Sequence, residues 1–311
     1  MRKHKHAHWF FTLCLFASII LMPACGQESQ DGASSDVDAF KPFEQGRGKL
    51  AFSAQESSDA MYDLFLIHLQ DGELFRITKN TYADIAPSLA KDGLTITFSS
   101  DKRGDYDLYT AALPDGLPEL VFMSSAQETE ARISPDGTRI VFQSNIYGDY
   151  DIYTIGMNED KPLRLTEEDS QETQPSWSPH SEQIAYVSDR DGDFEIYLMN
   201  ADGSGVVQLT KNDYYDAAPA WSPDGKHIAF ISKRGAHFQL YLYDFESEQE
   251  STLTDFTGTV HSPAWSPDGS YLAFILDQNG ISRILATEPS SGEFFLVHEA
   301  FEKYAGLSWS E

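Results

Sequence analysis

Four acidic residues recur at intervals of 44 residues along the chain: Asp84, Glu128, Glu172 and Asp216. Each stands three residues before the position that Pro219 occupies in its own repeat. Carboxylates that lie close together raise one another's pKa unless a counter-charge neutralises them. If the fold brings these four side chains together, their spacing therefore favours a surface that binds a basic partner segment or a cation.

A second acidic group follows the pattern Asp189-x-Asp191-Gly192-Asp193. A calcium loop needs six to eight oxygen ligands in a defined geometry, and here the glycine stands one place early. We therefore expect no cofactor, with Ca²⁺ as the one cation considered. We assign these three aspartates to the same partner- or cation-binding acidic face. The open alternative is that Asp101, Asp149 and Asp189 cap backbone turns.

Catalytic patterns are weak in this sequence, and we expect no enzyme activity. The G-x-S-x-G motif of α/β-hydrolases is absent. His237 and His261 fall in loops on the expected acidic face, whereas the other histidines after residue 25 occupy different repeat positions. The alternative function is a carbohydrate-binding or metal-dependent lyase or hydrolase protein.

The elements that position these residues are short strands in a repeat of 44 residues. Pro219-Ala220-Trp221-Ser222-Pro223-Asp224-Gly225 has near-copies around Trp177 and Trp265, and the same register reaches Leu89, Ile133 and Trp309. Pro and Gly make each Ser-Pro-Asp-Gly a tight hairpin turn. Three further β-branched or aromatic runs follow in each unit. A fixed period of this size is typical of repeat architectures.

Four strands in each of six units predict an all-β, six-bladed β-propeller of antiparallel blades over residues 48–311. The repeats begin with a second strand at Leu50 and finish with a first strand at Trp309. We therefore expect the C-terminal strand to close the ring by joining the N-terminal blade, which removes exposed strand edges. The repeated tryptophans are predicted to be core residues.

The recurring P-x-W-S-P-D-G-x-x-I-A-F, (D/E)-I-Y and L-T elements resemble the WD-like repeats of the TolB family of periplasmic propellers, over residues 48–311. The resemblance implies a non-catalytic protein that binds protein partners, in envelope integrity or transport assemblies. Because only 22 residues separate Cys25 from the first repeat, we expect the chain to lack the N-terminal α/β domain of full-length TolB.

The N-terminus has the pattern of an export signal. Basic residues precede an apolar run from Trp9 to Met22, which is shorter than the roughly 20 residues of a membrane span. Leu21-Met22-Pro23-Ala24-Cys25 resembles the lipobox of bacterial lipoproteins, which implies a signal peptide over 1–24 and a lipidated Cys25. Residues 25–47 are predicted to form a flexible tether. Gly26, rather than Asp, follows Cys25, so the resemblance favours the outer membrane, with the propeller facing the periplasm.

The charge balance limits the choice of partners. The chain of 311 residues has 22 basic and 49 acidic residues, a formal net charge of −27. Nucleic acid requires clustered basic residues, and anionic lipid headgroups would repel this chain. We therefore expect envelope proteins or basic peptide segments as partners, a membrane contact only through the lipid anchor at Cys25, no nucleic acid, and a monomer.

Overall fold

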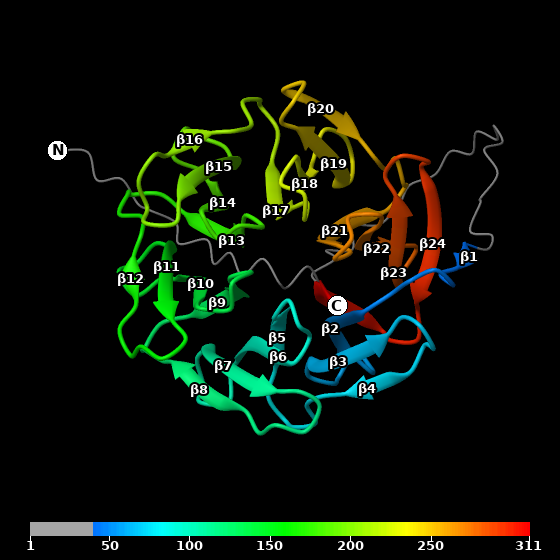
Figure 1. Cartoon of the computed structure of the whole chain (residues 1–311), viewed down its shortest axis with the longest axis horizontal. Coiled ribbons are helices and arrows are strands. Elements are labelled where there is room, and N and C mark those ends of the chain that lie inside the picture. Colours follow the sequence, from blue (N-terminus) through cyan, green and yellow to red (C-terminus); the bar gives the residue numbers. More distant parts are fainter. Residues whose placement is uncertain (1–39) are drawn as a thin grey trace, which may run out of the picture. The chain divides into compact units, whose positions relative to one another are not determined.

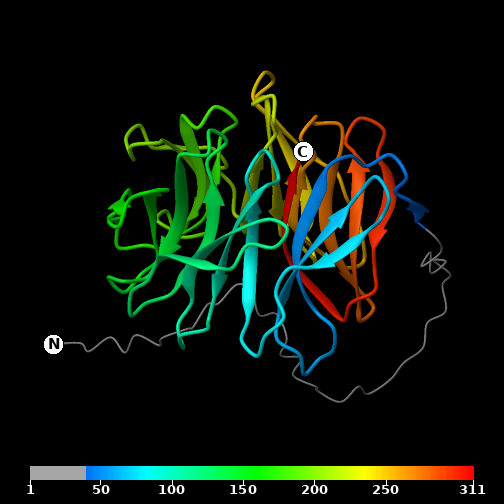
Figure 2. The same cartoon turned by 60° about the horizontal axis from the view of Figure 1, so that its bottom comes forward.

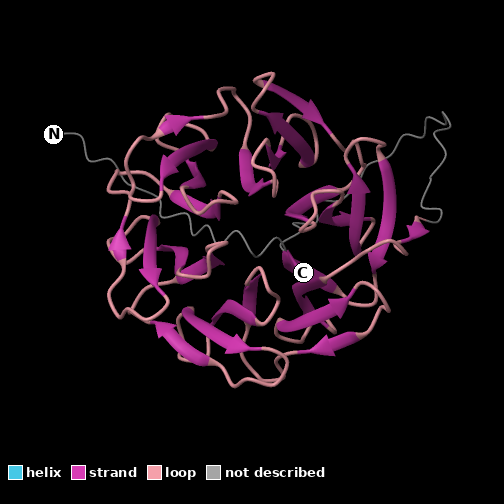
Figure 3. Cartoon of the chain, viewed as in Figure 1, coloured by secondary structure: helices cyan, strands magenta, loops and turns pink. Residues whose placement is uncertain are grey.

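Residues 40–311 form six four-stranded antiparallel blades arranged around a common axis in a computed structural model, which describes these residues (Figure 1). The elements of this part of the chain are strands and loops, without helices (Figure 3). None of its segments is a helix long and apolar enough to cross a membrane. The residues predicted to form the signal peptide and the lipobox, Cys25 among them, lie outside the described residues.

The blades follow the chain in order, and each is hydrogen-bonded from its innermost to its outermost strand. Blade one is β25 (Lys303–Ser310), β2 (Lys49–Gln55), β3 (Asp63–His68) and β4 (Leu74–Arg76). Blade two is β5 (Asp84–Leu89), β6 (Thr95–Ser100), β7 (Asp107–Ala112) and β8 (Glu119–Phe122). Blade three is β9 (Glu128–Ile133), β10 (Arg139–Ser144), β11 (Asp151–Gly156) and β12 (Leu163–Arg164).

The remaining blades have the same plan. Blade four is β13 (Glu172–Trp177), β14 (Gln183–Ser188), β15 (Glu195–Asn200) and β16 (Val207–Gln208). Blade five is β17 (Asp216–Trp221), β18 (His227–Ser232), β19 (Gln239–Asp244) and β20 (Gln249–Thr252). Blade six is β21 (Thr259–Trp265), β22 (Leu272–Gln278), β23 (Ile281–Glu288) and β24 (Glu293–His298).

The predicted ring closure is confirmed. The C-terminal strand β25 pairs antiparallel with β2, from Lys49 opposite Ser310 to Gln55 opposite Lys303. The indole of Trp309 also donates to the carbonyl of Arg47 at 2.8 Å. The last strand of the chain is therefore the inner strand of the first blade, beside β2 in Figure 2.

One strand was not predicted. Residues 41–42 form β1 (Lys41–Pro42), which pairs in parallel with β24 on the outside of blade six (Figure 1). The ring of Phe43 packs edge-on against Tyr271 and Trp309, with centroids 5.0 and 5.9 Å apart. The C-terminal end of the tether predicted over 25–47 is therefore attached to the propeller.

The core lies between adjacent blades and follows the 44-residue period. Leu64 and Leu66 of blade one, for example, pack with Ile96 and Phe98 of blade two. One aromatic residue on the second strand of every blade is at most 2% exposed: Phe52, Phe98, Phe142, Tyr186, Phe230 and Phe274. The predicted packing role of the tryptophans is confirmed in part, since the indoles of Trp177 and Trp265 donate to carbonyls of the preceding blade at 3.1 Å. Burial of these rings between blades stabilises the closed ring.

The Ser-Pro-Asp-Gly turns also form as predicted. In blade five, the hydroxyl of Ser222 donates to the carboxylate of Asp224 at 2.6 Å, and Gly225 has φ = 71°. A residue with a side chain rarely adopts such a φ, which explains the glycine. These hairpins lie on one face of the ring, which we call the hairpin face. The loops between second and third strands and the loops joining blades lie on the other, which we call the crossover face.

The inner strands carry a second repeating feature that the sequence did not reveal. Each has a bulge at a residue in the left-handed region, with φ between 51° and 55°: Ala86, Glu130, Gln174, Ala218, Ser262 and Gly306. Neighbouring blades are linked there, because the amide of Gln174 donates to the side chain of Gln143, and Ala218 donates to Gln174, both at 2.8 Å. The bulges therefore hold the first strands, whose N-terminal residues include the predicted acidic positions.

Candidate functional site

The four carboxylates at the 44-residue spacing begin the inner strands β5, β9, β13 and β17 at the crossover face. They are not exposed there: Asp84 is 1% exposed, and Glu128, Glu172 and Asp216 are 0% exposed. The expectation that they form an open acidic surface is wrong, because the loop preceding each strand covers its first side chain. These carboxylates cannot contact a partner directly in this structure.

Hydroxyl and amide groups of the same blade or of the loop that leads into it bind these carboxylates. Ser124 and Ser144 donate their hydroxyls to Glu128 at 2.6 and 2.8 Å. The side-chain amides of Asn80 and Asn212 donate to Asp84 and Asp216 at 2.7 and 2.8 Å. Burial raises the pKa of all four carboxyls, and the hydrogen bonds partly offset this. Their role is to fix the crossover loops.

A second set of buried acids, which the sequence reading passed over, begins the third strands: Asp63, Asp107, Asp151 and Glu195. Each is 1–4% exposed. Arg76 and Arg164 pair with Asp63 and Asp151, at 2.5 and 2.7 Å. The signal was present in the sequence, since these acids also recur every 44 residues, each directly before an aliphatic and an aromatic residue.

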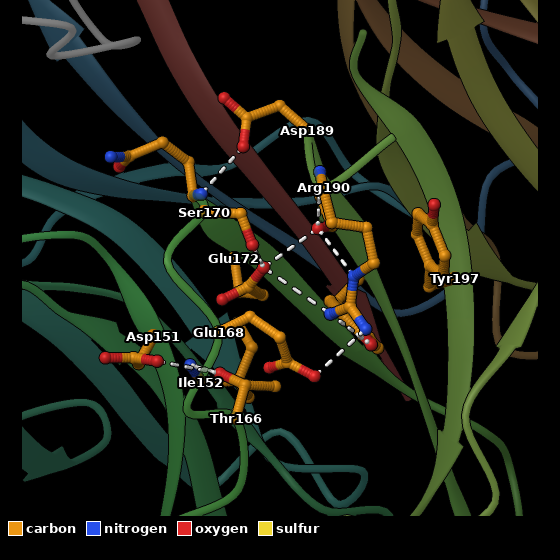
Figure 4. A network of polar contacts seen from close by, with 12 residues as sticks. Asp151, Ile152, Thr166, Glu168, Ser170, Glu172, Asp189, Arg190 and Tyr197 are labelled. Carbon is orange, nitrogen blue, oxygen red and sulfur yellow. Dashed lines mark hydrogen bonds and ion pairs between the residues drawn. The ribbon is translucent and has the colours of Figure 1, made fainter. Parts of the chain in front are cut away.

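Arg190 neutralises one member of the first set (Figure 4). Its guanidinium lies 3.4 Å from Glu172 and 3.2 Å from Glu168, and its Nε donates to Ser188 at 3.0 Å. It also lies over the ring of Tyr197, 4.7 Å from the centroid. Because Glu172 is fully buried, this arginine provides the counter-charge that a buried carboxylate requires.

Two aspartates of the second acidic group, Asp189 and Asp191, accept hydrogen bonds within the crossover loops. Asp189 accepts the backbone amide of Gln171 at 2.8 Å (Figure 4), and Asp191 accepts the hydroxyl of Tyr197 at 2.5 Å. Asp149 likewise accepts the side-chain amide of Gln171, at 2.6 Å, from the neighbouring blade. Asp189 therefore caps a backbone amide, as the open alternative predicted. The amide belongs to the adjacent loop rather than to the turn that contains Asp189. Asp193 lies half-buried in the same loop.

Candidate metal ligands are gathered elsewhere. Within residues 40–311, the ligand atoms of His68, Asp71 and Glu73 form the one group of at least three His, Cys, Asp or Glu that lie within 4.8 Å of one another, on the β3–β4 turn. Asp71 and Glu73 are exposed. The set Asp189, Asp191 and Asp193 is not brought together in this way.

The two histidines considered for catalysis have separate surroundings. His261 lies 3.5 Å from Asp277, which also pairs with Lys303 at 3.6 Å. Burial alone would raise the pKa of Asp277, but His261 and Lys303 lower it to about 2. His237 is exposed on the β18–β19 loop. Within the described residues, His261 is therefore part of an ion-pair network between blades six and one.

Glu195 differs from its counterparts because no arginine pairs with it. Its Oε1 accepts the amide of Asn212 at 2.6 Å, whereas its Oε2 and the Oδ1 of Asp216 are buried without a partner. Burial and the adjacent Asp216 raise the pKa of Glu195 to about 7. Because the pKa of Glu195 is higher in the folded protein than in the unfolded chain, its ionised carboxylate destabilises the fold above pH 7. This destabilisation disappears as the pH falls towards 4.5.

We expect Glu195→Gln to raise the free energy of unfolding at pH 8 by up to about 3 kcal/mol, since a pKa shift of one unit corresponds to about 1.4 kcal/mol. The gain should disappear near pH 5, where the wild-type carboxyl is protonated. Denaturant titrations at both pH values measure it. Asp151→Asn, the equivalent change in blade three, is the control and should destabilise because it leaves Arg164 unpaired. A lower free energy of unfolding for Glu195→Gln than for the wild-type protein at pH 8 would contradict the raised pKa of Glu195.

Comparison with known proteins defines the family. The family model described as TolB beta propeller domain matches residues 129–255 and 217–310, which together span more than half of the 311-residue chain. The chain belongs to this family. No curated protein matches it.

Solved structures share the fold with this TolB-family propeller. TolB from Acinetobacter baumannii is 18% identical with a TM-score of 0.75, over 85% of this chain and 66% of that chain. A putative TolB from Agrobacterium tumefaciens is 21% identical with a TM-score of 0.68, over 82% and 90%. An oligogalacturonate lyase in complex with manganese is 15% identical with a TM-score of 0.58, over 84% and 78%. Similarity at these identities establishes the architecture alone.

Proposed function

We propose that this TolB-family propeller is a non-catalytic, lipid-anchored protein of the bacterial cell envelope that binds the basic segment of a protein partner at its crossover face. The observation that carries the proposal is the exposed charge on the loops of blades three to five. Six exposed carboxylates occupy these loops: Asp149, Glu167, Glu168, Asp169, Asp191 and Asp213. Lys211 and Lys233 are the exposed lysines of the same loops.

These exposed acids replace the buried set that the sequence suggested. Glu167, Asp169 and Asp213 make no hydrogen bond or ion pair through their carboxylates within residues 40–311. Their charge is therefore available to a partner. The arginines of these loops are paired, Arg190 with Glu172 and Glu168 and Arg234 with Glu250. A basic segment would meet a predominantly acidic surface, which speeds association and disfavours acidic partners.

The location and the anchor complete the proposal. Lipidation of Cys25 would hold the propeller at the membrane, with the outer membrane favoured and the propeller facing the periplasm. The family relationship and the sequence pattern of residues 1–25 support this placement. Residues 40–47, which pack on blade six, would be the point at which the tether joins the folded body.

The test is a triple charge reversal on each face. Glu167→Lys, Asp169→Lys and Asp213→Lys change the crossover face, and Asp160→Lys, Glu182→Lys and Glu246→Lys make a matched change on the hairpin face, where these three residues are also exposed. We expect the first variant to lose recovery of its partner from an envelope extract and binding of a ten-residue Lys/Arg-rich peptide. The second should retain both. Equal binding by all three proteins would overturn the proposal.

A further inference from the structure

A cavity of about 270 Å³ opens at the crossover face, where the outer strand β8 of blade two meets blade three. Much of its wall is apolar or aromatic, from the side chains of Phe122, Ile146, Tyr147, Tyr153 and Pro162. Of these, Tyr147 is 72% exposed and Ile146 is 42% exposed. Apolar side chains that stay exposed together, with polar loops around them, mark surfaces at which proteins bind one another.

The size of the cavity suits one side chain rather than a whole small molecule. Pockets that enclose a small-molecule ligand run from roughly 300 to 1,000 Å³, and this cavity is smaller. In protein interfaces, a few anchor side chains that fill pockets of the partner provide most of the binding energy, and Trp, Tyr and Arg are common among them. The cavity therefore has the dimensions of an anchor site for a bound segment.

The wall favours an aromatic anchor. The rings of Tyr147 and Phe122 would each pack with a second ring, and such ring pairs are worth more than the area that they bury. The guanidinium of Arg164 lies 4.8 Å from the centroid of Tyr147 and is paired with Asp151 at 2.7 Å. A cationic anchor would be repelled by this guanidinium, whereas the face of an aromatic ring is attracted to it. An aromatic side chain therefore fits the wall better than Lys or Arg.

The same position is occupied from within the chain in blades four and five. Arg190 and Arg234 stand 44 and 88 residues after Ile146 and lie over third-strand tyrosines, 4.7 and 4.2 Å from the ring centroids. Both arginines are paired with acidic side chains, Glu168 among them. In blade three the uncharged Ile146 stands there instead, so this part of the crossover face offers an apolar surface to a partner.

Acidic side chains stand beside the cavity. Glu167 lines it, and Asp169 lies two residues further along the same loop. Both are exposed, and neither makes a hydrogen bond or ion pair through its carboxylate within residues 40–311. Lys or Arg residues next to the anchor in a bound segment would therefore meet complementary charge, and acidic residues there would be repelled.

We propose that the basic segment bound at the crossover face inserts one aromatic side chain into this cavity. The ring would lie against Tyr147, Ile146 and Phe122, and a Lys or Arg residue next to it would pair with Glu167. This inference rests on the proposed function and adds the sequence that the partner presents, an aromatic residue flanked by basic ones. Charge would then bring the segment to the face, and the aromatic anchor would fix its position there.

The test compares two labelled Lys/Arg-rich peptides of about ten residues, one with a central Phe and one with Ala in its place. Fluorescence anisotropy gives their dissociation constants. The Phe peptide should bind about tenfold more tightly, because its ring is buried in the cavity. This ratio should persist in roughly 0.5 M salt, which screens charges but not apolar contacts.

Variants of the wall show whether the cavity is responsible. Tyr147→Ala and Ile146→Gln remove parts of the apolar wall, so each should reduce the ratio to below about threefold without changing the affinity of the Ala peptide. Tyr214→Ala is the matched control. Tyr214 is also an exposed tyrosine of the crossover face beside a guanidinium, that of Arg234 at 5.4 Å, but it does not line the cavity. Its removal should leave the ratio at about tenfold.

Three results would overturn the inference. Equal affinity of the wild-type protein for both peptides, weakened by Glu167→Lys, Asp169→Lys and Asp213→Lys together, would remove the anchor and leave the proposed function standing. Failure of both peptides to bind would overturn the inference and the proposed function together. A tenfold ratio that survives both Tyr147→Ala and Ile146→Gln would place the aromatic ring elsewhere. Melting curves of every variant separate these results from misfolding.

Discussion

Removal of residues 303–311 should abolish cooperative unfolding of the propeller. These residues form the inner strand of blade one, and Tyr304 and Leu307 are 2% and 6% exposed in its core. Without β25, the inner edge of β2 loses seven paired residues and blade six loses its neighbour. An open edge of this kind also promotes aggregation. Thermal unfolding followed by circular dichroism measures the effect, and we expect no sharp transition.

Two controls make this result specific to ring closure. Removal of Glu311 alone leaves β25 intact and should preserve the transition. A synthetic peptide of residues 303–311 added to the truncated protein should restore a transition whose midpoint depends on peptide concentration, as linkage requires. A truncated protein that melted as sharply and at the same temperature as the full chain would show that the ring does not depend on this strand.

Arg190→Ala should destabilise the protein by about 3–5 kcal/mol at pH 7, because it leaves the fully buried Glu172 without a counter-charge. Burial raises the pKa of Glu172, and Arg190 opposes that effect. Loss of the arginine should raise this pKa further. A carboxyl with a raised pKa destabilises the folded protein at pH values above that pKa and not below it. The loss of stability in Arg190→Ala should therefore shrink as the pH falls towards 5. Denaturant titrations at several pH values measure both effects.

The matched control is Lys102→Ala, at the equivalent position of blade two. Lys102 is exposed and lies 5.9 Å from the centroid of Tyr82, so its removal should change stability by less than about 1 kcal/mol. Glu172→Gln combined with Arg190→Ala should recover part of the loss, because the amide carries no charge. A pH-independent deficit that the second substitution did not reduce would assign Arg190 a packing role over Tyr197 instead.

The fold was predictable because its determinants are local and repeat at one period. The aromatic series from Phe52 to Phe274 marks one strand in each blade, and the Asp-Gly turns mark the hairpins. The position of Trp309 in the same register predicted the closure by β25. The pairing of residues 41–42 was not predictable, because a two-residue parallel strand has no alternation of its own and depends on the exposed edge of β24.

The site was predictable only in part, because a period shows which residues are equivalent but not which are exposed. Asp84 and its three counterparts share a register, yet their burial depends on partners that are scattered along the chain, such as Asn80 and Ser144. Of the acids that remain exposed, Asp169 and Asp213 share a repeat position, whereas Glu167 and Asp191 have no acidic counterpart 44 residues away.

The central claim is that the crossover face of blades three to five recruits a basic partner. Its most direct test is the dissociation constant of the captured partner, or of the Lys/Arg-rich peptide, for the two charge-reversal triples. We predict at least about tenfold weaker binding for the crossover-face triple, with Glu167, Asp169 and Asp213 changed to Lys. The hairpin-face triple, with Asp160, Glu182 and Glu246 changed to Lys, should change binding less than about twofold. The difference should disappear in roughly 0.5 M salt, where charges are screened. Equal affinity for both triples, or binding that salt leaves unchanged, would contradict it.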